Sequence, residues 1–266
     1  MCRPILAGAM LLAAIVLFAD GLGEAITISN PVNFRDNRGP NEVGGIIGDL
    51  NLVAAGNIVP SGAGTTATAT QGGTTLELGF LPLSVSPNQY LGAMPFNSSL
   101  TGPWTITATD ASGSVSVQSP VIATPRVLPL VSDLRVVGQG TTPTIMWTTP
   151  DLTGLSVDRA QFRVWDLDRN VAGFADIIFV SSALAPDAGS FTIPAGLLTI
   201  GGHYSFNVTL DDLNQLTPSS PLSVQNRSET FTGEFSPVPE PMTLTLLATA
   251  GGLGALYRWR RRKIRE

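Results

Sequence analysis

The chain has almost no cysteine, and its central part has no lysine. Cys2 is the only cysteine of the 266 residues. Disulfide bonds, thiolate catalysis and cysteine-ligated metals are therefore excluded from the rest of the chain. All eight basic residues between positions 26 and 237 are arginines, so Schiff-base chemistry at a lysine is excluded there as well. Stability has to come from a packed core, which a body of about 210 residues can supply.

Positive charge is scarce in this central part. Residues 26–237 carry sixteen acidic side chains against the eight arginines, a net charge of −8. An acidic surface repels a phosphate backbone, so nucleic acid is not an expected partner. The other basic residues lie at the two ends, one at Arg3 and six within the last nine positions. Ends that differ so much from the middle indicate targeting segments.

The first 25 residues have the pattern of a secretory signal peptide. Arg3 precedes the uncharged run Ile5–Ala19, and Gly23-Glu-Ala25 places small residues at the two positions that signal peptidase reads. About fifteen apolar residues are few for a membrane-spanning helix. We therefore expect cleavage by signal peptidase at Ala25 and export of the rest, the alternative being an uncleaved N-terminal anchor.

Short alternating segments replace long apolar runs and helical periodicity in the body. Alternation of period two predicts strands at residues 65–71, 74–80, 104–110, 114–119, 144–148, 160–166 and 204–211. Asp110–Gly113 predicts a hairpin connection, and the prolines at 125 and 129 indicate a seam between two units. The expected fold class is all-β, with two immunoglobulin-like or fibronectin type III-like β-sandwich modules at residues 26–125 and 126–235.

The alternation in the second module also predicts which side chains are buried. Tyr204, Phe206, Val208 and Leu210 should face a core, and the residues between them should face water. In the segment 160–166, Trp165 is expected on the outward face. There it could stack on a sugar ring, or pack under a loop, which is the favoured alternative.

The second module resembles a fibronectin type III domain. Its segments "TIMWTTPD", "AQFRVWD" and "FTIPAGLLTIGGHYSFNVTL" follow the order of strands B, C and E–F in that family. Leu198 and Tyr204 are similar to the family's E–F corner, which implies a hydrogen bond from the tyrosine hydroxyl back to the loop. Gly201-Gly202 stands where that loop usually has prolines. The first module, with "TGPWTITATDASGS", resembles the last hairpin of a bacterial immunoglobulin-like module.

His203, the only histidine, is expected to be a surface turn residue, because a triad would need a carboxylate and an activated serine around it. Asp166, Asp168 and Asn170 occupy positions one, three and five of a calcium loop. Position six is valine and position twelve is isoleucine, so an exposed connection is favoured over calcium.

The remaining acidic residues give no catalytic pattern. The adjacent pair Asp211-Asp212 is interpreted as solvation of a strand end. Carboxylates for glycoside hydrolysis usually come from different strands and cannot be paired from spacing. We therefore expect no enzyme activity, no cofactor and no metal. A secreted polysaccharide-acting hydrolase with an unidentified carboxylate pair is the alternative.

Residues 236–266 contain three consecutive segments. A proline-rich stretch includes Pro239, Glu240 and Pro241, and the run Met242–Tyr257 has no charge. As a helix this run is about 24 Å long, slightly shorter than the hydrocarbon core of a bilayer. A basic tail at 258–266 should stay on the cytoplasmic side. Its charges are Arg258, Arg260, Arg261, Arg262, Lys263 and Arg265.

This order of segments resembles the PEP-CTERM sorting signal of exported proteins in Gram-negative bacteria that make extracellular polysaccharide. The resemblance implies recognition of Pro239, Glu240 and Pro241 by an exosortase-type transpeptidase, which removes the tail after transient anchoring in the inner membrane. The expected destination is the cell surface or the extracellular space. The expected function is a structural or adhesive role in the exopolysaccharide or biofilm matrix, with extracellular polysaccharide as a candidate partner.

Overall fold

The computed structural model describes residues 25–214 and 223–239, and this part of the chain is almost entirely β-structure. The expected all-β class is therefore confirmed. Its elements are β1 (Thr27–Arg38), β2 (Gly48–Val59), β3 (Thr66–Gln71), β4 (Thr74–Leu83), β5 (Ser86–Pro95), the 3-10 helix η1 (Ser98–Leu100), β6 (Thr105–Asp110), β7 (Gly113–Gln118), β8 (Ser132–Val137), β9 (Thr144–Thr148), β10 (Arg159–Val171), β11 (Phe174–Val180), β12 (Ser190–Thr192), β13 (Tyr204–Asn214) and β14 (Ser223–Phe231).

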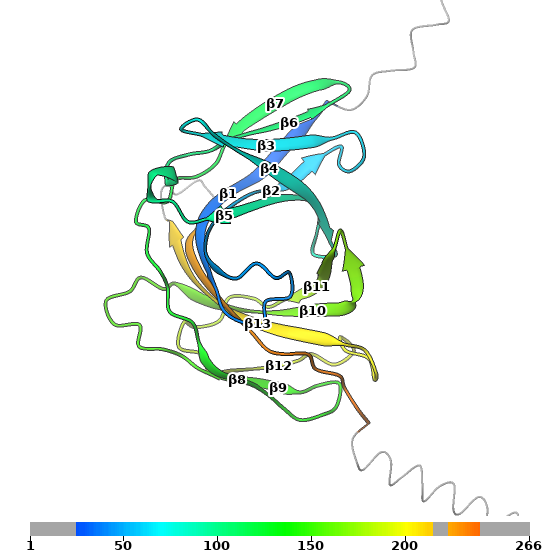
Figure 1. Ribbon diagram of the computed structural model, residues 1–266. Coiled ribbons are helices and arrows are strands. Elements are labelled where there is room, and N and C mark those ends of the chain that lie inside the picture. Colours follow the sequence, from blue (N-terminus) through cyan, green and yellow to red (C-terminus); the bar gives the residue numbers. More distant parts are fainter. Residues whose placement is uncertain (1–24, 215–222, 240–266) are drawn as a thin grey trace, which may run out of the picture.

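The strands form two sheets (Figure 1). The larger sheet has eleven strands in the order β11-β10-β13-β14-β1-β2-β5-β4-β3-β6-β7, and the smaller one has the order β12-β9-β8. The large sheet curves strongly, so that β4 and β5 lie opposite β10 and β11 across its concave side (Figure 1). Each strand segment expected from alternation lies within or largely overlaps one of these strands.

The first half of the chain, β1 to β7, curls around its own apolar core. Trp104, Ile106 and Ala108 are fully buried, whereas the threonines between them face outward because side chains alternate along a strand. Val53, Ile58 and Tyr90 contribute to the same core from β2 and β5. Asp110 pairs with Gly113 at the end of the β6–β7 ladder, which confirms the hairpin.

The second half forms a β-sandwich. The sheet β12-β9-β8 packs over β10 and β13, and the core between them includes Trp147, Phe162 and Phe206. Phe162 stacks against Phe206 with 5.9 Å between the ring centroids. The segments assigned by resemblance to strands B, C and E–F become β9, β10 and β12–β13.

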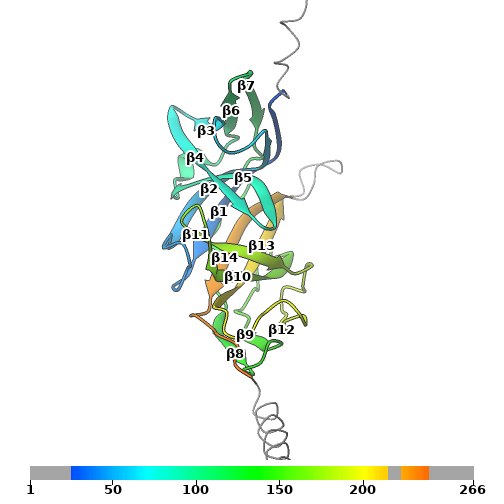
Figure 2. The same cartoon turned by 90° about the vertical axis from the view of Figure 1, so that its right-hand side faces the viewer.

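Strand β1 connects the two halves into one sheet. It pairs with β2 along its whole length, and its last four residues, Arg35–Arg38, also pair in parallel with Asn226–Glu229 of β14. Figure 2 shows the resulting elongated molecule, with β6 and β7 at one end and β8 and β9 at the other. The expected module boundary at residue 125 falls between β7 and β8, and this pairing spans it.

Candidate functional site: a buried ionic network

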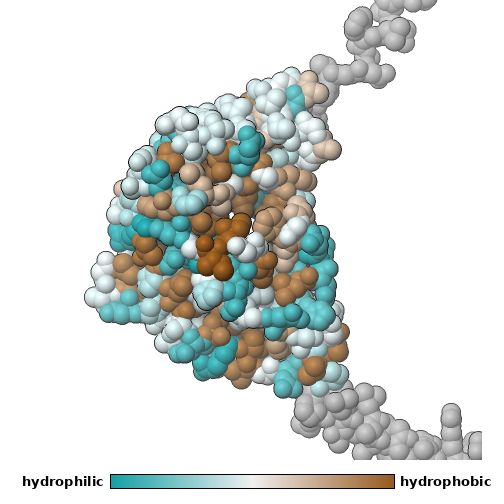
Figure 3. Space-filling model, in the orientation of Figure 1, coloured by the Kyte–Doolittle hydropathy of each residue, from teal (hydrophilic) through white to brown (hydrophobic). Residues whose placement is uncertain are grey.

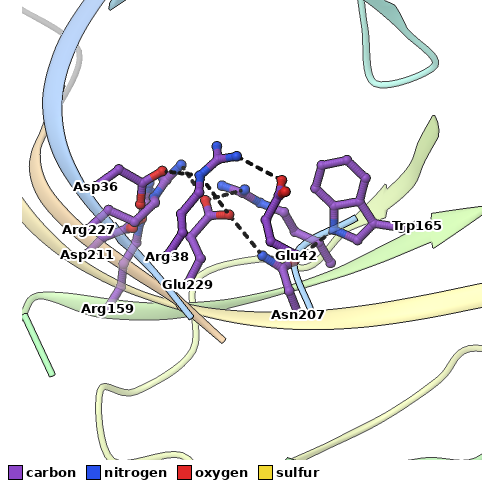
Figure 4. A network of polar contacts seen from close by, with 10 residues as sticks. Asp36, Arg38, Glu42, Arg159, Trp165, Asn207, Asp211, Arg227 and Glu229 are labelled. Atoms are coloured by element: carbon purple, nitrogen blue, oxygen red, sulfur yellow. Dashed lines mark hydrogen bonds and ion pairs between the residues drawn. The ribbon is translucent and has the colours of Figure 1, made fainter. Parts of the chain in front are cut away.

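Charged side chains gather on the concave face of β10, β13, β14 and β1, where these strands lie next to one another (Figure 4). Alternate residues of a strand share a face, and the register brings these residues together. Asp211 is opposite both Arg159 and Arg227, and Arg38 is opposite Glu229. The network consists of Asp36, Arg38, Glu42, Arg159, Arg163, Asn207, Asp211, Arg227 and Glu229.

Asp211 is bound by two arginines at once. Its carboxylate accepts hydrogen bonds from Arg227 Nε at 2.7 Å and from Arg159 Nε at 2.9 Å. Arg227 Nη2 donates a further bond at 3.2 Å. The guanidinium group suits such sites because its planar fork binds a carboxylate through more than one N–H. The completely buried Asp211 therefore has its charge compensated.

Glu229 is the second centre of the network. Arg163 Nη1 donates to its Oε1 at 3.0 Å, and Asn207 Nδ2 donates to its Oε2 at 3.3 Å. Asn207 in turn accepts a hydrogen bond from the indole N–H of Trp165 at 3.2 Å. The network thus extends from the β1–β14 junction to an aromatic side chain on β10.

The loop that follows β1 covers this face. Glu42 accepts a hydrogen bond from Arg38 Nη1 at 2.9 Å, and its other oxygen accepts from the N–H groups of Gly44 and Ile46. Val43 packs against a neighbouring apolar cluster that includes Trp165. Figure 3 shows apolar side chains gathered near the middle of the concave side. Glu42 is therefore the residue that ties the covering loop to the network.

Burial and neighbouring charges give the carboxylates different proton affinities. Burial, followed by the charge of Glu229, raises the pKa of Asp36 from 3.8 to about 7. Burial also acts to raise the pKa of Glu229, but the surrounding arginines, Arg163 first, outweigh it and lower that pKa. For Asp211 the arginines, with Arg227 foremost, likewise outweigh burial and lower the pKa. Asp36 therefore keeps its proton to a higher pH than Glu229 and Asp211 do.

Two buried oxygens on this face have no hydrogen-bond partner among the described residues. They are Asp36 Oδ1 and Thr209 Oγ1. The other oxygen of Asp36 accepts a hydrogen bond from Arg38 Nε at 2.7 Å. An unpartnered Oδ1 is compatible with a proton on that atom, because a neutral carboxyl group costs less to bury than a carboxylate.

The central carboxyl groups of the network are buried, whereas its arginines are partly exposed, with Arg159 at 25%. Asp36 and Asp211 are 0% exposed and Glu229 is 1% exposed. An open depression of about 520 Å³ on the described surface is lined by the 149–153 loop, Asp187 and Gly189, and no network residue lines it. A substrate would have to displace the covering loop before it could reach these carboxylates.

The prediction that one face of β13 is exposed to water is wrong. Ser205, Asn207, Thr209 and Asp211 are all buried, because the network arginines and the neighbouring strands cover them. The interpretation of Asp211-Asp212 as strand-end solvation is wrong for the same reason. Asp212 is fully buried and accepts hydrogen bonds from Gln225 and Asn226 at 3.0 and 2.7 Å.

Trp165 does not point outward into solvent. It is 8% exposed and packs against Phe231 with 6.1 Å between ring centroids, beside Leu81, Leu83 and Ile177. The outward face of the sandwich is the concave face of the large sheet, so the side chain is covered by β4 and β11. The favoured alternative, packing under a loop, is correct in that the side chain is covered, but the buried residues around it lie on strands β4, β11 and β14.

His203 lies in an exposed pair with Asp168. Its Nδ1 is 2.7 Å from Asp168 Oδ1, and its backbone N–H donates to Asp168 Oδ2 at 2.9 Å. The hydrogen bond and charge of Asp168 raise the pKa of His203, and the hydrogen bond from His203 lowers the pKa of Asp168. Glu234 lies 3.8 Å from Nε2. The structure thus brings the surface histidine together with a residue of the calcium-loop pattern.

The calcium-loop residues are occupied by local hydrogen bonds. Asp166 accepts from the Asp168 N–H, and Asn170 accepts from the Gly173 N–H. Asp168 itself is bound to His203. Among the described residues there is no group of three or more metal-ligating side chains placed to hold an ion.

Tyr204 and Leu198 lie at the corner before β13. The Tyr204 hydroxyl accepts a hydrogen bond from the Thr199 N–H at 3.1 Å, and Leu198 is 3% exposed within the sandwich core. A Cβ atom at Gly202 would lie 2.6 Å from the Tyr204 hydroxyl oxygen. Glycine therefore stands at this position because the tyrosine ring passes directly over the backbone.

The residues expected to act in targeting lie at or beyond the ends of the described chain. Ala25 and Pro239 are exposed. Glu240, Pro241, the apolar run 242–257 and the basic residues Arg258, Arg260, Arg261, Arg262, Lys263 and Arg265 lie outside the described residues. Within residues 25–214 and 223–239, no helix has the length and apolar character to cross a bilayer.

The network could not be predicted from the sequence because its residues come from distant parts of the chain. A local signal does exist in the spacing of Asp36 with Arg38 and of Arg227 with Glu229. Opposite charges two residues apart share one face of a strand, and such pairs recur on strands that turn out to be neighbours.

Comparisons with known proteins identify no family for this chain. No protein-family model matches it, and no curated protein matches it. A crystal structure of the chicken CNTN1 FN1-FN3 domains is similar at 10% sequence identity and a TM-score of 0.32. The match covers 79% of this chain and 67% of that one. A likeness this distant adds nothing to the fold, which is defined by the strand pairing above.

Proposed function

We propose that the chain is an exported protein of a Gram-negative bacterium with a structural or adhesive role in the extracellular matrix. Signal peptidase removes the leader at Ala25. An exosortase-type enzyme recognises Pro239, Glu240 and Pro241 and releases the body from a transient membrane anchor. The ionic network supports a structural body, because its central carboxylates are buried and held by arginines.

The exposure of Val238 and Pro239 at the end of the body supports the proposed recognition by a sorting enzyme. Pro237 is buried and its carbonyl accepts a hydrogen bond from Gly201, whereas Val238 and Pro239 are exposed. The proline-rich motif thus begins at the residue where the chain leaves the body. A processing enzyme can reach the motif without unfolding any strand.

Mass spectrometry of the cell envelope and the medium tests this proposal. The released form is expected to begin near Ile26 and to lack residues 242–266. Glu240→Ala combined with Pro241→Ala is expected to leave a heavier, membrane-bound precursor, whereas the control Glu234→Ala, an exposed carboxylate upstream, is processed normally. Release of the double variant with its tail still attached would contradict the proposal.

One observation favours the second candidate function, a polysaccharide-acting hydrolase. Asp36, with a pKa of about 7, lies near Glu229, whose pKa is lowered, and such unequal carboxyl pairs serve as acid and base in glycosidases. This function requires the loop held by Glu42 to open. Hydrolysis of a polysaccharide by the wild type that is lost in Asp36→Asn would support it.

A further inference from the structure

Three segments that meet where the body ends each carry an exposed apolar side chain. The large apolar residues that are well exposed in the described chain are Ile47, Val85, Val127, Val137, Ile200 and Val238. Three of these, Val137, Ile200 and Val238, belong to segments that meet at one end of the molecule, and we call them the basal patch. Figures 1 and 2 show the last described residues leaving the body at this end, beside β8 and β9.

Backbone hydrogen bonds hold the three segments together. Gly201 N–H donates to the Pro237 carbonyl at 3.0 Å, so Ile200 and Val238 each flank a bonded residue. Val238 N–H donates to the Gln139 carbonyl at 2.8 Å, which places the end of β8 on the other side. Ile200 lies in the 199–202 turn, which is closed by a hydrogen bond from Gly202 to Thr199. The basal patch is therefore built on fixed backbone.

The three segments carry no charge. Residues 137–142 read VGQGTT, residues 199–202 read TIGG and residues 236–239 read SPVP. An uncharged surface of small polar residues with projecting apolar side chains loses little when it enters the interfacial region of a bilayer. Charge begins directly beside these segments, since His203, which follows Gly202, pairs with Asp168 and lies 3.8 Å from Glu234.

The residues that follow Val238 indicate what the basal patch contacts. Pro239, Glu240 and Pro241 are the only residues between Val238 and the uncharged run 242–257. Even a fully extended chain keeps the first residue of that run within about 14 Å of Val238. Whatever receives the apolar run must therefore lie next to the basal patch.

We propose that the basal patch rests on the surface of a lipid bilayer while the tail is still attached. This inference depends on the proposed function, in which the run 242–257 enters the membrane. Three side chains add little affinity compared with a membrane-spanning segment, so they set the orientation of the body. The long axis then stands away from the membrane, and Val238, which directly precedes the motif, lies at the level of the lipid headgroups.

Fluorescence quenching on residues 26–266, the form from which the leader has been removed, tests this orientation in phosphatidylcholine vesicles. This form contains no native cysteine, so a single fluorophore can be attached at Ile200→Cys or at Val238→Cys. Val85→Cys is the matched control, because Val85 is 45% exposed in the turn between β4 and β5, against 52% for Ile200 and 42% for Val238. All three side chains are on the surface, so the label leaves the cores intact.

Labels at Ile200 and Val238 are expected to be quenched severalfold more by a lipid-attached nitroxide than the label at Val85, and less by iodide in the water. Equal quenching at the three positions, in protein that floats with the vesicles, would overturn the orientation while membrane anchoring stands. Protein that does not float with the vesicles would overturn both the anchoring and the orientation. Flotation is measured on the unlabelled chain as well, which separates these two results.

Discussion

Asp36 and Glu229 are close neighbours across the β1–β14 junction, and Arg38 contacts both of them. Arg38 Nε lies 2.7 Å from Asp36 Oδ2 and 4.0 Å from Glu229 Oε2. Two carboxyl groups that share one guanidinium cannot both be ionised without cost. The junction between the two halves of the chain is therefore sensitive to the protonation of Asp36.

The first prediction is that Asp36→Asn changes the pH dependence of stability. The pKa of Asp36 rises from 3.8 to about 7 on folding, so between these values the folded state binds a proton that the unfolded state has released. The free energy of unfolding therefore falls as pH rises through this range. The amide that Asp36→Asn introduces retains an oxygen for Arg38 and does not titrate.

Urea unfolding at about pH 5 and about pH 8 measures this effect. The variant is expected to lose less stability than the wild type between the two values, and to be the more stable protein at the higher one. Asp49→Asn, at a partly exposed pair with Arg35, is the control. Parallel pH profiles for Asp36→Asn and the wild type would contradict the prediction.

The second prediction compares a buried ion pair with an exposed one. Arg227→Leu leaves Asp211 buried with Arg159 as its remaining close partner, and it is expected to cost about 3–5 kcal/mol. Asp49→Ala removes a carboxylate whose side chain is 36% exposed, and it should cost about 0–1 kcal/mol. Denaturant unfolding checks both values, and similar small costs would show that Asp211 does not depend on Arg227.

The third prediction concerns the corner before β13. Tyr204→Phe leaves the Thr199 N–H without its acceptor and is expected to cost about 1–3 kcal/mol. Phe206→Ala opens a cavity in the sandwich core and should cost about 3–5 kcal/mol. Gly202→Ala should also destabilise, since its Cβ would lie 2.6 Å from the Tyr204 hydroxyl. A neutral Tyr204→Phe beside a severe Phe206→Ala would show that the corner adds no stability.

The fourth prediction concerns the exposed pair of His203 and Asp168. The raised pKa of His203 means that its pairing stabilises the fold fully below the ordinary histidine value of 6.5 and is lost as pH rises through the folded-state pKa. NMR titration should therefore place His203 above 6.5 in the wild type and lower in Asp168→Asn. Because His203 is the only histidine, the ring signal needs no assignment. An unchanged titration in the variant would show that Asp168 is not the cause.

Alternation of side chains identified β13 and its inner face correctly from sequence. Tyr204, Phe206, Val208 and Leu210 all lie in the sandwich core. The same alternation does not show that the opposite face, with Asp211, is buried. A polar residue at that position produces the same sequence pattern whether it contacts water or a buried arginine. Asp211 meets Arg227 through a strand pairing that no local pattern specifies.

The long-range topology also could not be predicted from the sequence. The parallel pairing of Arg35–Arg38 with β14 joins the first and last strands of the body, and neither segment carries a signal for the other. One feature of the sequence is consistent with the network, namely that every basic residue of the body is an arginine. Arginine pairs with buried carboxylates better than lysine does, because its fork makes several directed hydrogen bonds.

The pairing of β1 with β14 also sets an order of events during folding. A chain is made from its N-terminus, so β1 is complete long before β14 exists, and contacts between such distant segments form late. Until then, the edge of β1 that later receives β14 is open, and open edges promote aggregation. Arg35, Asp36 and Arg38 lie on that edge. The charges that end up buried at the junction therefore first serve as gatekeepers, which keep an unfinished sheet from pairing with other chains.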